Sequence, residues 1–221
     1  MKPTCTITGC DRPRATKYTP YCARHKANHR RNGHAEQQRT SKAMLKPYLR
    51  TVRARIKRNP SNPAWEALDK RWLALLRHSE GISASYARGV PGFRYEVLAA
   101  REVIKTASAD TRLIVETTMA MMVFREFEPH QFKSDRAFWI QLSRQVRSLT
   151  DLSYCTRFRP SSGRIQRVYR ELPPTAALTM GRWLTELLGV GGLKIAQLEM
   201  AEQERRAGER TALHAALNEL A

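Results

Sequence analysis

Apolar residues recur at helical spacing along most of the chain, and this periodicity predicts a mainly helical protein. Leu45, Leu49 and Val52 return at intervals of four and three, as residues on one face of a helix do. Patterns of this kind predict helices at about 36–58, 63–78, 93–108, 111–127, 135–149, 175–188 and 193–219. We expect a loop at 81–92 and a glycine-rich turn at 189–192 between the last two helices.

The pattern changes to that of a β-hairpin between residues 153 and 170. Segments 153–159 and 164–170 are rich in β-prone residues, and the Pro160-Ser161-Ser162-Gly163 sequence between them suits a short turn. The expected fold class is therefore mainly α with one β-hairpin. Three helices followed by a hairpin, from 93 to 170, is also the order of elements that a winged helix-turn-helix needs.

The first 34 residues differ from the rest of the chain. They are polar, contain Cys and His, and have too few large apolar residues for a core of their own. The Asn59-Pro60-Ser61-Asn62-Pro63 sequence is a strong helix breaker and the best candidate for a boundary. We therefore expect an N-terminal module at 1–34, a basic helix and linker at 35–60, and a helical domain with the hairpin at 61–221.

The sequence lacks the signals of membrane and secreted proteins. Its longest uninterrupted apolar run, Met119–Phe124, is far shorter than the ~18 residues that span a bilayer, and no apolar stretch follows the first residues. We expect a cytoplasmic protein, associated with the nucleoid if the source is bacterial, with no membrane partner. A P-loop, a G-x-S-x-G elbow and an H-E-x-x-H pair are absent from the sequence, so no catalytic residue is assigned.

Positive charge is concentrated in two segments. The chain of 221 residues has a formal net charge of +19. Residues 1–60 hold 16 Lys and Arg against two acidic residues, which leaves +14, and residues 133–170 hold nine against two, which leaves +7. Charge of this density repels itself unless phosphates or counter-ions neutralise it. We predict a nucleic-acid partner, with DNA favoured over RNA.

Basic and polar side chains of these two segments are the expected contacts. The N-terminal set is Arg12, Arg14, Lys17, Arg24, Lys26, Arg30, Arg31, Lys46, Arg50, Arg53, Arg55, Lys57 and Arg58. The second set, on the helix 135–149 and the hairpin, is Arg144, Gln145, Arg147, Arg157, Arg159, Arg164 and Arg167. Arg and Gln can read guanine and adenine edges, and guanidinium groups match pairs of phosphate oxygens. Tyr154, Phe158 and Tyr169 either stack on bases of a single strand or belong to the core.

The N-terminal module contains a metal-ligand pattern. Cys5, Cys10, Cys22 and His25 have the spacing C-x4-C-x11-C-x2-H, and three thiolates with one imidazole satisfy a tetrahedral zinc ion. A closed set of four ligands leaves no position for an activated water, so the zinc is expected to be structural. His29 and His34 are nearby alternatives to His25. A disulfide or unrelated reduced cysteines are the other interpretations, and the expected cytoplasmic location disfavours the disulfide.

These residues also resemble a known kind of module. Cys5-x4-Cys10-Asp11-Arg12-Pro13, then Tyr21-Cys22-x2-His25 and Arg30-Arg31-Asn32-Gly33-His34, are similar to a short zinc-binding module of phage and mobile-element proteins, often found beside HNH-type homing endonucleases. The resemblance covers about residues 1–34. It implies that the three Cys and the His bind zinc and that the Arg-rich segment faces nucleic acid. A second His-Asn-His array, which the nuclease would need, does not follow in the sequence.

Together these features predict a zinc-stabilised nucleic-acid-binding protein, acting as a transcription regulator or targeting factor of a phage or mobile element. A non-enzymatic role is favoured. The alternatives are a metal-dependent nuclease, whose carboxylates would come from distant parts of the sequence, and an RNA-binding component of a ribonucleoprotein. The last helix carries the stripe Leu213, Leu217 and Leu220, which packs either on the core or on a partner protein.

Overall fold

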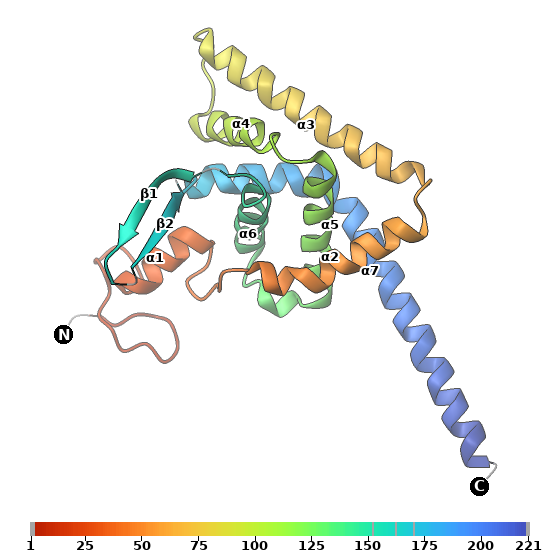
Figure 1. Cartoon of the computed structure of the whole chain (residues 1–221). Coiled ribbons are helices and arrows are strands. Elements are labelled where there is room, and N and C mark those ends of the chain that lie inside the picture. The colour runs from red at the N-terminus through yellow and green to blue at the C-terminus, as the bar shows by residue number, and fades with distance from the viewer. Residues whose placement is uncertain (1–2, 152, 162, 170, 220–221) are drawn as a thin grey trace.

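The computed structural model describes residues 3–151, 153–161, 163–169 and 171–219, without the side chains of 153–155, 166–169, 216, 217 and 219. Over these residues the chain forms seven α-helices and one antiparallel hairpin (Figure 1), which confirms the predicted fold class. The helices are α1 Ala23–Asn32, α2 Lys42–Arg58, α3 Pro63–Ala87, α4 Arg94–Thr106, α5 Thr111–Phe127, α6 Asp135–Arg147 and α7 Pro174–Glu219. A 3-10 turn, Pro129–Gln131, links α5 to α6, and the hairpin strands are β1 Ser153–Arg159 and β2 Arg164–Tyr169.

The core lies where α7 crosses α5 and α6, and α3 and α4 pack beside this crossing (Figure 1). Phe124, Phe138 and Leu184 are almost fully buried there, together with Trp72 of α3. Burial of one such side chain stabilises the fold by about 1.5–3 kcal/mol. The periodic apolar positions of the sequence therefore form one continuous core.

Helix α2, which lies in the segment predicted as a basic helix and linker at 35–60, belongs to this core. Leu45 and Val52 of α2 are buried in the same cluster as Trp72 and Phe124, because α2 packs along α5. The breaker at 59–63 is a turn between α2 and α3 within that single cluster. Asn62 caps α3, as its side chain accepts a hydrogen bond from the backbone N–H of Ala64.

The predicted turn at 189–192 and most of the predicted loop at 81–92 are helical. Helix α7 continues through the glycines, and α3 extends to Ala87. Packing requires Gly192, because a Cβ there would lie 2.6 Å from the Met119 carbonyl oxygen, and it restricts Gly191, where a Cβ would lie 2.8 Å from Cδ1 of Leu68. Glycine in this helix allows a close crossing of helices and does not end the helix.

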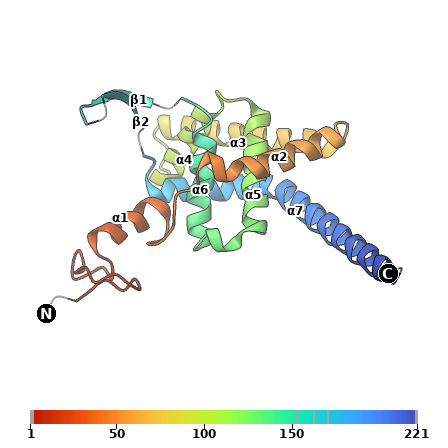
Figure 2. The same ribbon diagram turned by 60° about the horizontal axis from the view of Figure 1, so that its bottom comes forward.

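The second half of α7 projects from the body of the protein (Figures 1 and 2). Arg55 of α2 pairs with Glu199 and Glu202 where α7 leaves the core. Beyond that point, residues 203–215 are exposed, and Leu213 retains 60% of its accessible surface. Leu213 of the leucine stripe therefore does not pack on the core. The side chain of Leu217 and residue 220 lie outside the described residues.

The hairpin and α6 are arranged differently from a winged helix. The hairpin extends away from the helices, and the segments that overlap it in Figure 1 are separate from it in Figure 2. In a winged helix the third helix is presented to the major groove, whereas α6 is buried against α7 on one side and covered on another by the chain around Thr40. The order of elements is as expected, but α6 is not an exposed recognition helix. No helix among the described residues is long and apolar enough to cross a bilayer.

Candidate metal centre and basic surface

The loop that carries Cys5 and Cys10 is held by backbone hydrogen bonds. The N–H of Cys5 donates to the carbonyl of Arg12 at 2.9 Å, which pairs the two ends of the loop. The N–H of Cys10 donates to the carbonyl of Ile7 at 3.0 Å, and Gly9 adopts a φ of 74° in this turn. Glycine accepts that left-handed conformation at little cost. The turn therefore brings the thiols of Cys5 and Cys10 to the same side of the loop.

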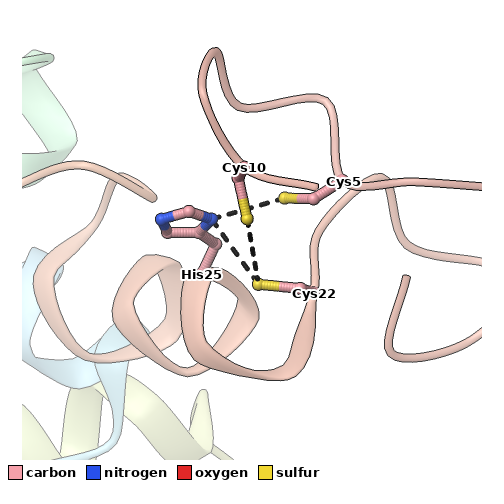
Figure 3. A group of neighbouring side chains, drawn as sticks. All are labelled: Cys5, Cys10, Cys22 and His25. Atoms are coloured by element: carbon pink, nitrogen blue, oxygen red, sulfur yellow. Dashed lines mark hydrogen bonds between the residues drawn. The ribbon is translucent and has the colours of Figure 1, made fainter. Parts of the chain in front are cut away.

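The other two candidate ligands come from the start of α1. Cys22 is the residue before the helix, with extended backbone, and His25 lies in the first turn. Residues three apart lie on the same face of a helix. The C-x2-H spacing thus directs both side chains toward the loop that carries Cys5 and Cys10 (Figure 3).

All four candidate ligand atoms lie within 4.8 Å of one another. Sγ of Cys10 is 3.8 Å from Sγ of Cys22, and Nδ1 of His25 is 3.3 Å from Sγ of Cys5 and 3.6 Å from Sγ of Cys22 (Figure 3). Cys5 and Cys22 are buried, and Cys10 and His25 are half-buried. The three described cysteines are free rather than paired in a disulfide. This arrangement is compatible with a metal site.

The structure also distinguishes among the three nearby histidines. Only the His25 ring faces the sulfurs among the described residues. The ring of His29 instead packs against Tyr21 at 5.4 Å, and Nδ1 of His34 accepts a hydrogen bond from the backbone N–H of Glu36. His25 is therefore the ligand candidate, through Nδ1, a choice that spacing alone left open.

The thiols influence one another electrostatically. A backbone hydrogen bond from His25 lowers the pKa of Cys22, which favours its thiolate form. At Cys10 a backbone hydrogen bond from Arg12 also lowers the pKa, but burial and the neighbouring sulfurs of Cys22 and Cys5 outweigh it and raise the pKa. Crowded thiolates destabilise one another, and a divalent cation among them removes that repulsion.

A polar network that the sequence analysis missed fixes the N-terminal module to the helical domain. The side-chain amide of Asn28 donates to the carbonyl of Ala35 at 2.7 Å and to that of Gln37 at 3.1 Å. The buried amide of Gln37 in turn donates to the carbonyl of Gln131 at 2.9 Å. Such residues have no periodicity or motif, so only the folded chain identifies them.

Most predicted basic contacts of the N-terminal module are exposed. Within the part of the chain that the structure describes, five of them have no carboxylate within ion-pair distance: Arg12, Lys17, Arg24, Lys26 and Arg30. Arg14 is half-buried and donates to the carbonyl of Thr4, and Arg31 lies 3.6 Å from Glu171 with both side chains largely exposed. The module thus presents a surface of uncompensated positive charge.

The predicted contacts on α2 divide into two groups. Lys46, Arg50 and Lys57 are exposed and have no ionic partner among the described residues. Arg53, Arg55 and Arg58 instead pair with carboxylates of α5 and α7, namely Glu116, Glu199 and Glu202. Part of the charge that the sequence assigned to a ligand therefore stabilises the contacts between helices.

The second predicted set of contacts requires correction on α6. Gln145 is buried, and its amide donates to the carbonyl of Thr40 at 2.7 Å, so it does not face a groove. Arg147 pairs with the buried carboxylate of Glu102 at 2.6 Å. Gln145 was predicted as a nucleic-acid contact from its residue type alone. Residue type does not reveal that α6 is covered on this side. Arg144 is half-buried and hydrogen-bonds to Asn32.

The hairpin residues are better exposed. Arg157, Arg159 and Arg164 are exposed, and the Arg167 side chain lies outside the described residues, as do those of Tyr154 and Tyr169. Phe158 keeps 59% of its accessible surface, so it does not belong to the core. The arginines of the hairpin remain candidates for ligand contacts, and Arg157, Arg159 and Arg164 have no ionic partner within the described residues.

Carboxylates do not gather into a second metal site among the described residues, where the Cys and His cluster is the group with suitable ligands. No protein-family model matches the sequence, and no curated protein or solved structure matches it. Inference about function therefore depends on the chemistry of the site.

Proposed function

We propose that this protein binds nucleic acid through a basic surface that includes a zinc-stabilised N-terminal module. The observation that carries the proposal is the uncompensated positive charge of residues 1–60, where most Lys and Arg side chains are exposed without ionic partners in the described chain. A polyanion is the ligand that relieves their mutual repulsion. The protein acts as a DNA-binding regulator or targeting factor of a phage or mobile element, in keeping with the module that residues 1–34 resemble.

The donor set of three thiols and one imidazole supports zinc as the metal, and two of the separations match a tetrahedral site. Zinc–sulfur bonds of about 2.3 Å in a tetrahedral site separate two sulfurs by about 3.8 Å, and sulfur from nitrogen by about 3.6 Å. The Cys10–Cys22 and Cys22–His25 separations are 3.8 Å and 3.6 Å, and the Cys5–His25 separation is shorter, at 3.3 Å. Cys5, Cys10, Cys22 and Nδ1 of His25 would hold the ion, which supplies folding energy rather than chemistry.

Zinc would act by organising a segment that lacks a core of its own. Structural zinc sites provide roughly 10–16 kcal/mol of apparent binding energy in small domains. In this chain that energy would fix the loop of Cys10 against the first turn of α1. The basic side chains of this loop and of α1 would then be held in a fixed arrangement.

Metal analysis of matched histidine variants tests the zinc assignment. We expect one zinc ion per chain in the purified protein, loss of that zinc in His25→Asn, and retention in His34→Asn. His34 is another histidine of the same module, and its Nδ1 accepts a hydrogen bond from the backbone N–H of Glu36. Zinc retained by His25→Asn, or lost equally by both variants, contradicts the ligand set.

Salt dependence of binding tests the nucleic-acid proposal. Fluorescence anisotropy with a labelled DNA duplex should show affinity falling steeply with salt, with a slope of about −0.9 per phosphate contacted. The variant Lys46→Gln/Arg50→Gln should reduce the magnitude of the slope by about 1.8 if each side chain contacts one phosphate. Arg205→Gln/Arg210→Gln, on the projecting part of α7, is the control with the same charge change. A flat salt curve contradicts the proposal.

Competition among polyanions then identifies the class of nucleic acid. Duplex DNA should displace the labelled duplex more effectively than single-stranded DNA or structured RNA. Stronger displacement by structured RNA contradicts the preference for DNA and favours a ribonucleoprotein role.

A further inference from the structure

A crevice separates α1 of the N-terminal module from α6 and the start of α7. Its volume is about 700 Å³, within the range of about 300–1,000 Å³ that is typical of ligand pockets. Residues of α1 and α6 contribute most of its lining. Residues 171–174, which lead from the hairpin into α7, and Ala15 and Thr16 of the N-terminal loop also line it.

The side chains that line this crevice are strongly cationic. Lys26, Arg30 and Arg31 come from α1, and Arg144 and Arg147 come from α6. Glu171 is the one acidic residue among the lining residues, and its carboxylate lies 3.6 Å from Arg31 with both side chains more than 60% exposed. Exposed pairs of this kind are weak. The crevice therefore holds a clear excess of positive charge.

Arg144 is the central group. Its guanidinium is half-buried and donates to the side-chain oxygen of Asn32, a neutral partner that fixes its orientation without neutralising its charge. Burial lowers the pKa of Arg144, and although Glu171 raises it, the nearby Arg39, Arg147 and Arg31 lower it further. Each of these effects makes the charged form of Arg144 less favourable. Arginine nevertheless stays charged at neutral pH. An anion beside the guanidinium would offset them.

The neighbouring groups distinguish Arg144 from Arg147. Arg147 lines the crevice from the same helix but pairs with the buried carboxylate of Glu102 at 2.6 Å. Arg144 has no carboxylate within ion-pair distance in the described part of the chain, and Lys26 and Arg30 have none either. These three cations remain available to a ligand.

The start of α7 adds to the positive potential. Pro174, the first residue of this helix, lines the crevice. The N-terminal end of a helix carries about half a positive elementary charge, and its first backbone N–H groups have no partners within the helix. Cationic side chains and a helix N-terminus therefore meet at one concave site.

From this geometry we infer that the crevice between α1, α6 and the start of α7 is a binding site for a phosphate group. Arg144 contacts two phosphate oxygens from α6, and Lys26 and Arg30, which are exposed at the rim, contact the anion from α1. The planar guanidinium fork matches a pair of phosphate oxygens better than it matches chloride or a single oxygen. This inference goes beyond nucleic-acid binding, because the phosphate can belong to a free phosphate-bearing molecule or to a nucleic-acid strand.

Calorimetric titration of the zinc-loaded full chain with inorganic phosphate tests the site, with sodium chloride used to keep the ionic strength constant. We expect saturable binding of one phosphate. Lys26→Gln/Arg30→Gln should weaken it by roughly tenfold or more, as expected for the loss of charge-assisted hydrogen bonds. Lys17→Gln/Arg24→Gln is the matched control, because it removes two exposed charges from the same module that do not line the crevice.

Arg144→Gln should abolish phosphate binding, and its circular dichroism spectrum and zinc content show whether the fold persists. The rim variant keeps the test decisive if Arg144→Gln does not fold, because Lys26 and Arg30 are exposed. Absence of saturable phosphate binding, or equal weakening by the rim and control variants, overturns the inference.

A second arm identifies the source of the phosphate and separates this inference from the proposed function. Displacement of phosphate by a short 5′-phosphorylated oligonucleotide supports a nucleic-acid source. Phosphate binding without competition by the oligonucleotide supports a free phosphate-bearing ligand and retains the site even if nucleic-acid binding fails. Nucleic-acid binding that is unaffected by phosphate and by Arg144→Gln excludes a nucleic-acid source for the phosphate in the crevice, while the proposed function remains.

Discussion

Replacement of Gly33 by alanine should loosen the attachment of the N-terminal module to α6. Gly33 follows α1 with a φ of 87°, a left-handed conformation that costs a residue with a Cβ about 1–2 kcal/mol. A Cβ there would also lie 2.8 Å from the backbone N and Cα of Ala137 and 2.9 Å from the carbonyl oxygen of Arg136. Backbone atoms cannot rotate away, and overpacking of this kind costs about 1–3 kcal/mol. The two effects together should reduce the free energy of unfolding by about 2–5 kcal/mol.

Gly89→Ala is the matched control for this prediction. Gly89 has a similar φ of 84°, but a Cβ there meets nothing within 4 Å. It should therefore show the conformational cost of about 1–2 kcal/mol without the overpacking. The difference between the two variants isolates the close approach of the module to α6.

Urea denaturation of the metal-loaded proteins, followed by tryptophan fluorescence and circular dichroism, measures both free energies. We expect Gly33→Ala to be the less stable variant by about 1–3 kcal/mol. Equal destabilisation of the two variants would refute the close contact between Gly33 and the start of α6, and with it the geometry of the adjoining crevice.

Three further predictions concern the helical domain. Tyr48→Phe should lower stability by about 1 kcal/mol in thermal denaturation, because Glu128 loses a hydrogen bond. In the parent protein, burial and Glu128 raise the Tyr48 pKa to about 12. Spectrophotometric titration should therefore show that the Tyr48 phenol ionises at higher pH than an ordinary tyrosine. The contribution of Tyr48 to the free energy of unfolding should fall between about pH 10 and 12. Gln145→Leu should cost about 1–3 kcal/mol in urea denaturation, because the Thr40 carbonyl loses its buried donor; no loss would contradict that buried contact. Burial raises the pKa of Glu202, but three neighbouring arginines lower it by more. The contribution of Glu202 to the free energy of unfolding should therefore be complete above about pH 4.5 and decline as the pH falls. Glu202→Gln should weaken the dependence of the melting temperature on acid pH.

Local pattern was sufficient for most of the secondary structure. Helix α5 spans 111–127, the range that apolar periodicity predicted, and strand β1 spans the predicted residues 153–159. Periodicity and turn chemistry report on contacts between near neighbours in the chain, so they identify such elements well. The glycines of α7 show where local pattern is insufficient. Gly192 permits a close approach to α5, which lies about 70 residues away in sequence, and no local pattern reveals that contact.

The sequence by itself determined the helical class, the spacing of the three cysteines and the uneven distribution of charge, because these are properties of residue type and order. Only the tertiary structure decided which histidine joins the sulfurs and that Gln145 is covered by the chain around Thr40. It also decided that Arg144 meets Lys26 and Arg30 across a crevice. The last two of these arrangements join segments more than 100 residues apart. The free energy of all three depends on burial and mutual distance, which arise only when the chain has folded.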